Sequence, residues 1–129
     1  MTTDTSRKLA ARLHDHGKPL VLEDVDPPVP AGDEVVIEMA FAGVNPIDRY
    51  IAEGRVAPDS PLPRTMGMEG AGRLADDGQA VLVHGAGLAM KRDGAWAQRV
   101  VAPRGAVTAI PEGVDLAQAA AMGVAGVTA

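Results

Sequence analysis

Glycine and proline recur so often along this sequence that they leave room only for short regular elements. The 129 residues include 15 glycines and 10 prolines. Proline fixes φ and lacks a backbone N–H, and glycine suits tight turns, so this density favours short strands and argues against a helical bundle. A chain of this length forms one ordinary domain. Because it has only three aromatic residues, aliphatic side chains must fill its core.

Apolar runs between the turns predict a series of short strands. They are expected at Lys8–Leu13, Pro19–Val25, Glu34–Val44, Ala80–His84, Ala97–Val101 and Ala106–Ile110. Within the third run, Val35, Ile37 and Met39 alternate with other residues and should share one face of the strand. The pattern is typical of a mainly β fold, and a partly open β-barrel fits it best.

Two short helices and one glycine-dense segment complete the pattern. Asn45–Gly54 is expected to be helical, with proline in its first turn and glycine at its end. Asp115 is expected to cap a second helix at Leu116–Met122. The apolar residues of Leu116–Ala129 should pack on a domain that is not in this chain, so we expect this segment to be poorly fixed. The backbone of Gly67–Gly72 should approach other atoms closely.

Charge and residue types exclude several functional classes. The net charge of −5 argues against a nucleic-acid surface, because phosphates require clustered Lys and Arg. The absence of cysteine excludes disulfides, thiolate catalysis and zinc sites built on thiolates. Met1–Arg7 is too polar for a signal peptide, and the longest uncharged stretch, Leu116–Ala129, is too short to span a bilayer. We therefore expect a cytoplasmic protein without membrane contact.

Four segments carry a family resemblance. They are GVNPIDRYIAEG (Gly43–Gly54), TMGMEGAG (Thr65–Gly72), GAWAQRVVAP (Gly94–Pro103) and IPEGVDLAQAAAMGVAGVTA (Ile110–Ala129). In this order, and with the opening strands, they resemble the quinone oxidoreductase-like, zinc-independent members of the medium-chain dehydrogenase/reductase superfamily. The resemblance covers nearly the whole chain.

The resemblance implies a fold and a function. Residues 1–114 would be a GroES-like substrate or catalytic domain, and residues 115–129 a helix and the start of a Rossmann nucleotide-binding domain that is otherwise absent. The implied reaction is NADPH-dependent reduction of a small carbonyl or quinone substrate (a quinone, enone or enoyl thioester), by an enzyme that can be a homodimer. This part alone is expected to be inactive. The alternative is a non-catalytic GroES-like binding or interaction module.

The same resemblance predicts that no metal is bound. In zinc-dependent relatives a cysteine begins a C-x-x-D pattern and a histidine precedes a glutamate, whereas here Asn45 and Met68 stand at those positions. An amide and a thioether cannot replace a thiolate and an imidazole around zinc. The acidic residues of both patterns are kept. Asp48 is expected to bind local backbone or Arg49, and Glu69 to hold the glycine-rich turn.

Three residues form the expected site. The resemblance places Asn45 near the nicotinamide, while its other interpretation is a cap on the helix that begins at Pro46. Tyr50 would line the substrate cleft and donate a proton or hydrogen bond, or it would be a half-buried packing residue. Thr128 matches a threonine that reaches the nicotinamide amide in relatives.

Two further patterns are interpreted as structural. VLVHGAGLAM (Val81–Met90) superficially resembles a dinucleotide-binding turn, but Met90 stands where glycine or alanine is required, so we expect a barrel strand and a turn. His14 and His16 are spaced as a metal pair on a strand, but no third ligand is evident and exposed turn residues are favoured. His84 is expected to be a hydrogen-bonded structural residue rather than a catalytic base.

Overall fold

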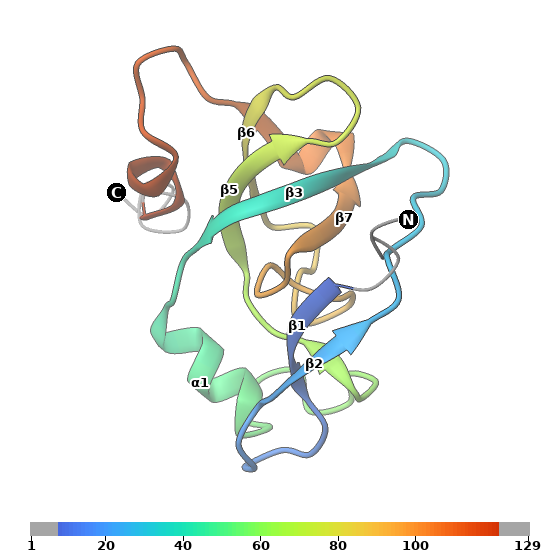
Figure 1. Cartoon of the computed structure of the whole chain (residues 1–129). Helices are drawn as coiled ribbons and strands as arrows, with labels where there is room; N and C mark the ends of the chain where they lie inside the picture. The colour runs from blue at the N-terminus through green and yellow to red at the C-terminus, as the bar shows by residue number, and fades with distance from the viewer. Residues whose placement is uncertain (1–7, 122–129) are drawn as a thin grey trace.

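The computed structural model describes residues 8–121, which form two antiparallel sheets (Figure 1). The three-stranded sheet has the order β2–β1–β4, with β1 at Lys8–Leu13, β2 at Val21–Val25 and β4 at Arg64–Thr65. The five-stranded sheet has the order β7–β3–β5–β6–β8, made of β3 (Glu34–Ala42), β5 (Glu69–Leu74), β6 (Ala80–His84), β7 (Arg99–Pro103) and β8 (Val107–Ala109).

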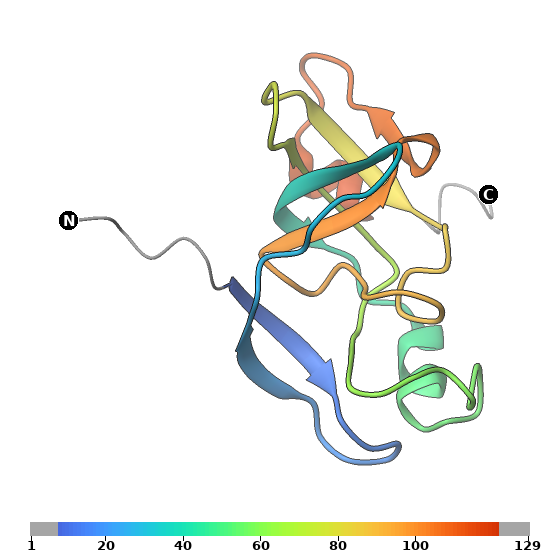
Figure 2. The same cartoon turned by 90° about the vertical axis from the view of Figure 1, so that its right-hand side faces the viewer.

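The five-stranded sheet curls into a half-barrel, and the β1–β2 hairpin lies at one end of it (Figures 1 and 2). Helix α1 (Pro46–Ala52) follows β3, and a 3-10 turn (Arg104–Ala106) joins β7 to β8. Residues 116–121 form a further helical segment, which Figure 1 shows beside the end of β3. The predicted mainly β architecture, a partly open barrel with short helices, is confirmed.

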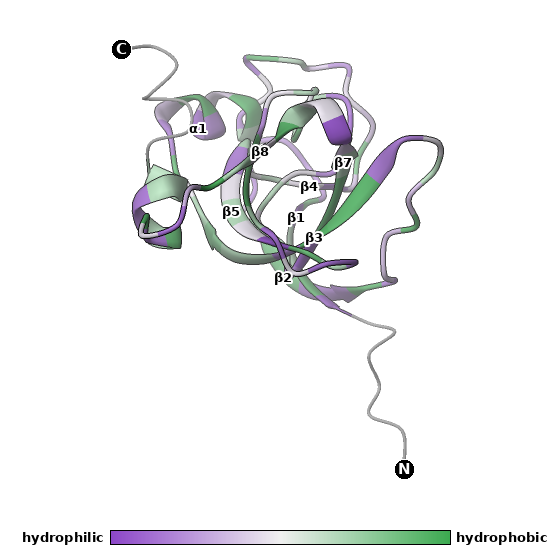
Figure 3. Ribbon diagram, turned by 90° about the horizontal axis from the view of Figure 1, so that it is seen from above, coloured by the Kyte–Doolittle hydropathy of each residue, from purple (hydrophilic) through white to green (hydrophobic). Residues whose placement is uncertain are grey.

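The main hydrophobic core lies inside the curl of the larger sheet. Val35 and Ile37 of β3 are 6% and 0% exposed and pack against Leu74, Val83 and Val100. The predicted alternation along β3 is confirmed, and Figure 3 shows hydrophobic and hydrophilic residues in bands along the strands. Burying each such aliphatic side chain contributes about 2 kcal/mol.

The strand prediction missed β4 and β5, and several of the other predicted strand ends were one or two residues off. β5 was not predicted as a strand because its glycines are depleted in strands generally, yet it is the central strand of the larger sheet. The predicted close approach of this segment is confirmed, because a Cβ on Gly72 would lie 2.1 Å from the carbonyl oxygen of Glu38. β7 begins two residues later than predicted, since Ala97 bridges to β1 instead. It includes Pro103, which an edge strand tolerates.

The helical segment near the end of the described chain also differs from expectation. Leu116, Ala119 and Ala120 pack against Ala71 of β5 and Ile110, and the two alanines are 8% and 3% exposed. Residues 116–121 therefore pack against the outside of the half-barrel of this chain rather than only on a further domain, because the sheet itself offers them an apolar surface. The rest of the segment expected to be poorly fixed lies outside the described residues.

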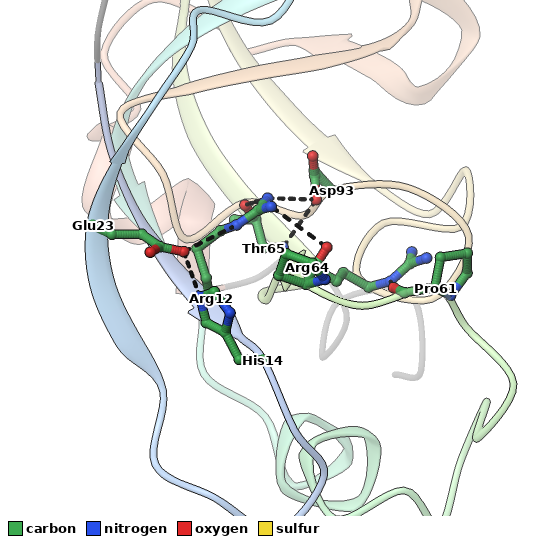
Figure 4. Close-up of polar contacts among 8 residues, drawn as sticks. Arg12, His14, Glu23, Pro61, Arg64, Thr65 and Asp93 are labelled. Carbon is green, nitrogen blue, oxygen red and sulfur yellow. Dashed lines mark hydrogen bonds and ion pairs between the residues drawn. The ribbon is translucent and has the colours of Figure 1, made fainter.

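A polar network links β1 and β2 to the loop before β7 (Figure 4). The Arg12 guanidinium donates to Thr65 Oγ1 and to Asp93 Oδ1, each at 3.0 Å, and Asp93 also accepts from the Thr65 N–H at 2.9 Å. Glu23 of β2 lies 3.6 Å from Arg12 and 2.6 Å from His14 Nε2. These contacts hold the small sheet to the loop before β7.

Replacing Glu34 with glutamine is expected to destabilise the fold at neutral pH but not in acid. The N–H of Ala31 and the Arg92 guanidinium, at 3.0 and 2.9 Å, lower the pKa of the Glu34 carboxyl below its ordinary value of 4.5. A lowered carboxyl pKa stabilises the folded state above the unfolded pKa, and this contribution is lost as pH falls through the folded pKa. Urea unfolding of the variant and the parent, from neutral pH down through the folded pKa of Glu34, measures the difference in their free energies of unfolding.

The exposed Glu112→Gln variant is the matched control for this measurement. It should unfold like the parent at every pH. A Glu34→Gln effect that persists unchanged in acid would contradict the assignment of the stabilisation to the ionised carboxylate.

Candidate functional site

The candidate site is built around the start of α1. Asn45 is the N-cap with extended backbone, Pro46 occupies the first turn, and the Asn45 N–H donates to Asp48 Oδ2 at 2.7 Å. Gly54 follows the helix with φ +80°, in the left-handed region that favours glycine. The predicted helix, its cap and the local backbone bond of Asp48 are confirmed.

The side chain of Asn45 is held by a residue from another strand. Asn45 Nδ2 donates to Glu69 Oε2 at 2.6 Å. Glu69 is the first residue of β5 and is 2% exposed, whereas Asn45 is only partly buried. The bond arises because β3 and β5 are neighbours whose register pairs Ala42 with Gly70, which places the segment after β3 over the start of β5.

Gly43 and Trp96 fix the backbone just before Asn45. The Gly43 N–H donates to the backbone oxygen of Glu69 at 3.1 Å, and the Trp96 indole donates to the Gly43 oxygen at 2.9 Å. A side chain on Gly43 would collide with the Glu69 carboxylate, since its Cβ would lie 2.5 Å from Oε2. The site therefore stands on a rigid, hydrogen-bonded segment.

Asn45 and Glu69 line a pocket of about 280 Å³ between the end of β3 and the helical segment 116–121. Its other lining residues are small or apolar: Phe41, Ala42, Gly43, Val44, Ala117, Ala120 and Ala121. Among the described residues, Glu69 is the only charged side chain in the lining. The pocket thus presents one amide, with a buried carboxylate behind it, to an otherwise apolar space.

Asp48, which bonds to the backbone of Asn45, is a buried carboxyl with an altered acidity. Its side chain is 3% exposed, and burial raises the pKa of the carboxyl above its ordinary value of 3.8. The hydrogen bond from the Asn45 backbone opposes the rise, and the negative charge of Glu69 adds to it. Asp48 Oδ1 is buried without a hydrogen-bond partner among the described residues.

Met68 does not join these polar groups. Its side chain packs against the apolar cluster of Leu13, Ile51 and Met66. Within residues 8–121, no group of three or more His, Asp or Glu side chains is arranged to hold a metal ion.

Tyr50 lies on α1 but not in the pocket around Asn45. It is 42% exposed, and the Arg55 guanidinium carbon lies 5.5 Å from the centre of its ring. The structure therefore does not bring the two expected site residues into one pocket of the described chain. Thr128, the third, lies outside the described residues.

The histidines lie away from the pocket or at its margin. His14 contacts Glu23, whereas the His16 ring lies against Gly54 after α1, so the two histidines have different neighbours. His84 ends β6 and stands opposite Glu69 in the strand register. Val81–Met90 forms β6 and a turn-rich loop, as expected, rather than a strand and helix.

The sequence did not predict the pairing of Asn45 with Glu69, nor the part that Gly43 and Trp96 take in it. The residues belong to three separate segments, and no local spacing connects them. The one available signal was that all three segments belong to the blocks that carry the family resemblance.

Of the described residues, no helix has the length and apolar character needed to cross a membrane.

The chain matches one protein family and several enzymes of known name. The model of the alcohol dehydrogenase GroES-like domain matches residues 31–112. The quinone oxidoreductase of Lama guanicoe is 32% identical over 96% of this chain and 40% of its own length. Quinone oxidoreductase 1 of Escherichia coli is 35% identical over 93% of this chain and 39% of its own length. The chain thus spans about two fifths of these relatives.

Solved structures agree on the fold. The quinone oxidoreductase from Coxiella burnetii superimposes with a TM-score of 0.78 at 21% identity, over 88% of this chain and 40% of that one. A thermostable alcohol dehydrogenase from Pyrobaculum aerophilum gives a TM-score of 0.77 at 26% identity, over 88% of this chain and 43% of that one. The expected GroES-like fold is confirmed.

Proposed function

We propose that this chain, which belongs to the alcohol dehydrogenase GroES-like domain family and has quinone oxidoreductases as relatives, is the substrate-side part of a nicotinamide-dependent oxidoreductase. The reaction is reduction of a quinone, enone or enoyl thioester by hydride transfer without zinc. Residues 1–114 form the substrate domain, and residues 115–129 lead into a nucleotide-binding domain.

The observation that carries this proposal is the amide of Asn45 at the pocket lined by Phe41, Val44 and Glu69. When hydride adds to a carbonyl compound, negative charge develops on its oxygen. A fixed N–H donor in a largely apolar pocket stabilises that charge far better than water does. Asn45 meets this requirement, because its helix cap and its bond to Glu69 hold it in place.

The pocket suits the uncharged reactive end of a nicotinamide cofactor. None of its described lining residues is basic, so the cofactor's phosphates must bind elsewhere, as on the helix N-terminus of a nucleotide-binding domain. When bound, the cofactor supplies the hydride. NADPH is the proposed form, Asn45 the residue that contacts its reactive end, and Thr128 a second contact.

The residues at the family's zinc positions do not fit zinc. Met68 packs into an apolar cluster, and Asn45 bonds to Glu69 through its amide nitrogen, which is a donor and not a ligand. The proposed reaction therefore depends on positioning and hydrogen bonding by the chain. In the complete enzyme, Tyr50 is proposed to face the substrate from α1 and to donate a proton or hydrogen bond. The enzyme is proposed to be cytoplasmic and homodimeric.

An alternative function is a non-catalytic binding module. A groove of about 440 Å³ favours it, because its lining is almost wholly apolar and includes the exposed Leu22 and Phe41, which are 69% and 47% exposed. Such a module would keep the barrel and have no turnover. The assay below separates the two functions.

Residues 1–129 alone are expected neither to reduce quinones nor to bind NADPH at micromolar concentration. A few hydrogen bonds of about 1 kcal/mol each do not offset the entropy cost of association. Joined to the nucleotide-binding part of the E. coli quinone oxidoreductase 1, the same residues should turn over. Calorimetric titration with NADPH and spectrophotometric reduction of a small quinone measure both results.

The intact E. coli enzyme, cut and rejoined at the equivalent position, is the control for the junction. A folded chimera without turnover, beside an active control, would support the binding module. Micromolar NADPH binding by residues 1–129 alone would show that the affinity for the cofactor does not depend on the nucleotide-binding domain, contrary to this proposal.

A further inference from the structure

The bond between Asn45 and Glu69 determines which end of the amide faces the carboxylate. A carboxylate only accepts hydrogen bonds, so the amide nitrogen must face Glu69 Oε2, at 2.6 Å. Turning the amide over would place two oxygens against each other. The two ends of an asparagine side chain are otherwise nearly equivalent in shape, so Glu69 selects between them.

Glu69 is itself held where it can do this. It is the first residue of β5, which pairs with β3 on one side and β6 on the other, and it is 2% exposed. The absence of a side chain on Gly43 leaves the space that the carboxylate fills. The Gly43 N–H also bonds to the Glu69 backbone oxygen, which ties the segment before Asn45 to the start of β5.

We propose that Glu69 is a positioning residue that orients the Asn45 amide so that its second N–H donates to the substrate oxygen. The amide nitrogen carries two hydrogens, of which Glu69 takes one. The other leaves at about 120° to the first and is the donor available at the pocket that both residues line. Glu69 acts through Asn45 and makes no contact with the substrate. This inference rests on the proposed function.

The arrangement defines the substrate chemistry. A fixed N–H favours a reacting group that accepts a hydrogen bond, such as the carbonyl oxygen of a quinone, enone or thioester. It does not favour a hydroxyl that needs an acceptor. The hydrogen bond at the reacting centre therefore runs from the Asn45 N–H to the substrate oxygen, a direction that the family likeness alone does not give.

Asn45 is the only asparagine in the chain, so its side-chain amide can be observed by itself. With asparagine labelled by ¹⁵N, residues 1–129 should give one pair of amide proton signals. One proton should lie far downfield of its partner and exchange slowly. Glu69→Gln keeps an oxygen acceptor, so the chemical shifts of the two Asn45 amide protons should still differ, by a smaller amount. Glu69→Met keeps the linear shape without that acceptor, and its two signals should move together.

Kinetics of the chimera described above test the catalytic half of the inference. Glu69→Met should lower kcat about tenfold and change the KM for NADPH less than about twofold, because only the transition-state contact is misplaced. Glu69→Gln should restore most of the rate. The exposed Glu53→Gln variant is the control for loss of a carboxyl near α1 and should leave the rate unchanged.

The outcomes separate this inference from the proposed function. An inactive parent chimera beside an active junction control would refute the proposed function, and the substrate contact with it, while the NMR signals still report whether Glu69 orients the amide. An active parent whose Glu69→Met variant is equally fast would refute the positioning role alone. Ordinary Asn45 signals that do not respond to Glu69→Met would refute the orientation itself.

Discussion

Replacing Gly72 with alanine is expected to cost about 3 kcal/mol of folding free energy or to prevent folding. Gly72 lies in β5, which is hydrogen-bonded to strands on both sides. An added Cβ would lie 2.1 Å from the Glu38 oxygen and 2.9 Å from the Met39 Cα. These are backbone atoms of the neighbouring strand, so no side-chain rotation relieves the collision, and β3 and β5 would have to separate.

Guanidinium unfolding followed by fluorescence of Trp96, the only tryptophan, measures this change. Gly105→Ala is the matched control, because no atom of residues 8–121, apart from its chain neighbours, lies within 4 Å of a Cβ at that position. It should alter stability by less than about 0.5 kcal/mol. Equal midpoints for the two variants would show that the two strands are not as closely apposed as described.

Removing the amide of Asn45 is expected to have the largest effect on activity. In the chimera, Asn45→Ala should lower kcat about a hundredfold, the usual effect of deleting one donor to a developing oxyanion. The same change also removes a helix cap and a bond to Glu69, which should cost about 1 kcal/mol of stability. The loss of rate should therefore greatly exceed what unfolding explains. Initial rates and unfolding midpoints of the same preparation supply both values.

Arg49→Gln is the control on the same helix, since Arg49 is exposed and pairs with Glu53 at the surface. It should leave the rate unchanged. Tyr50→Phe tests the second proposed site residue and should lower the rate without lowering stability. If Asn45→Ala and Arg49→Gln give equal rates in an active chimera, the assignment of the donor is wrong even though the family is right.

The sequence by itself determined the local elements and the family. The proline and glycine positions defined the turns. Short apolar runs identified β1 and β6, and apolar alternation identified β3, because both patterns are properties of neighbouring residues. The helix at α1 was predictable for the same reason, since Pro46 and Gly54 act on the backbone where they stand. Asn45 was proposed as a site residue from a motif within twelve consecutive residues, Gly43–Gly54.

Only the tertiary structure decided how distant segments meet. β5 became a central strand because β3 and β6 supply hydrogen bonds on both sides, which outweighs the poor strand preference of its glycines. The pairing of Asn45 with Glu69 depends on the register of β3 against β5. Tyr50 lies outside the Asn45 pocket because its position on α1 places its ring beside Arg55 instead. Strand register is a long-range property, since it depends on which segments pack together, and local patterns do not record it.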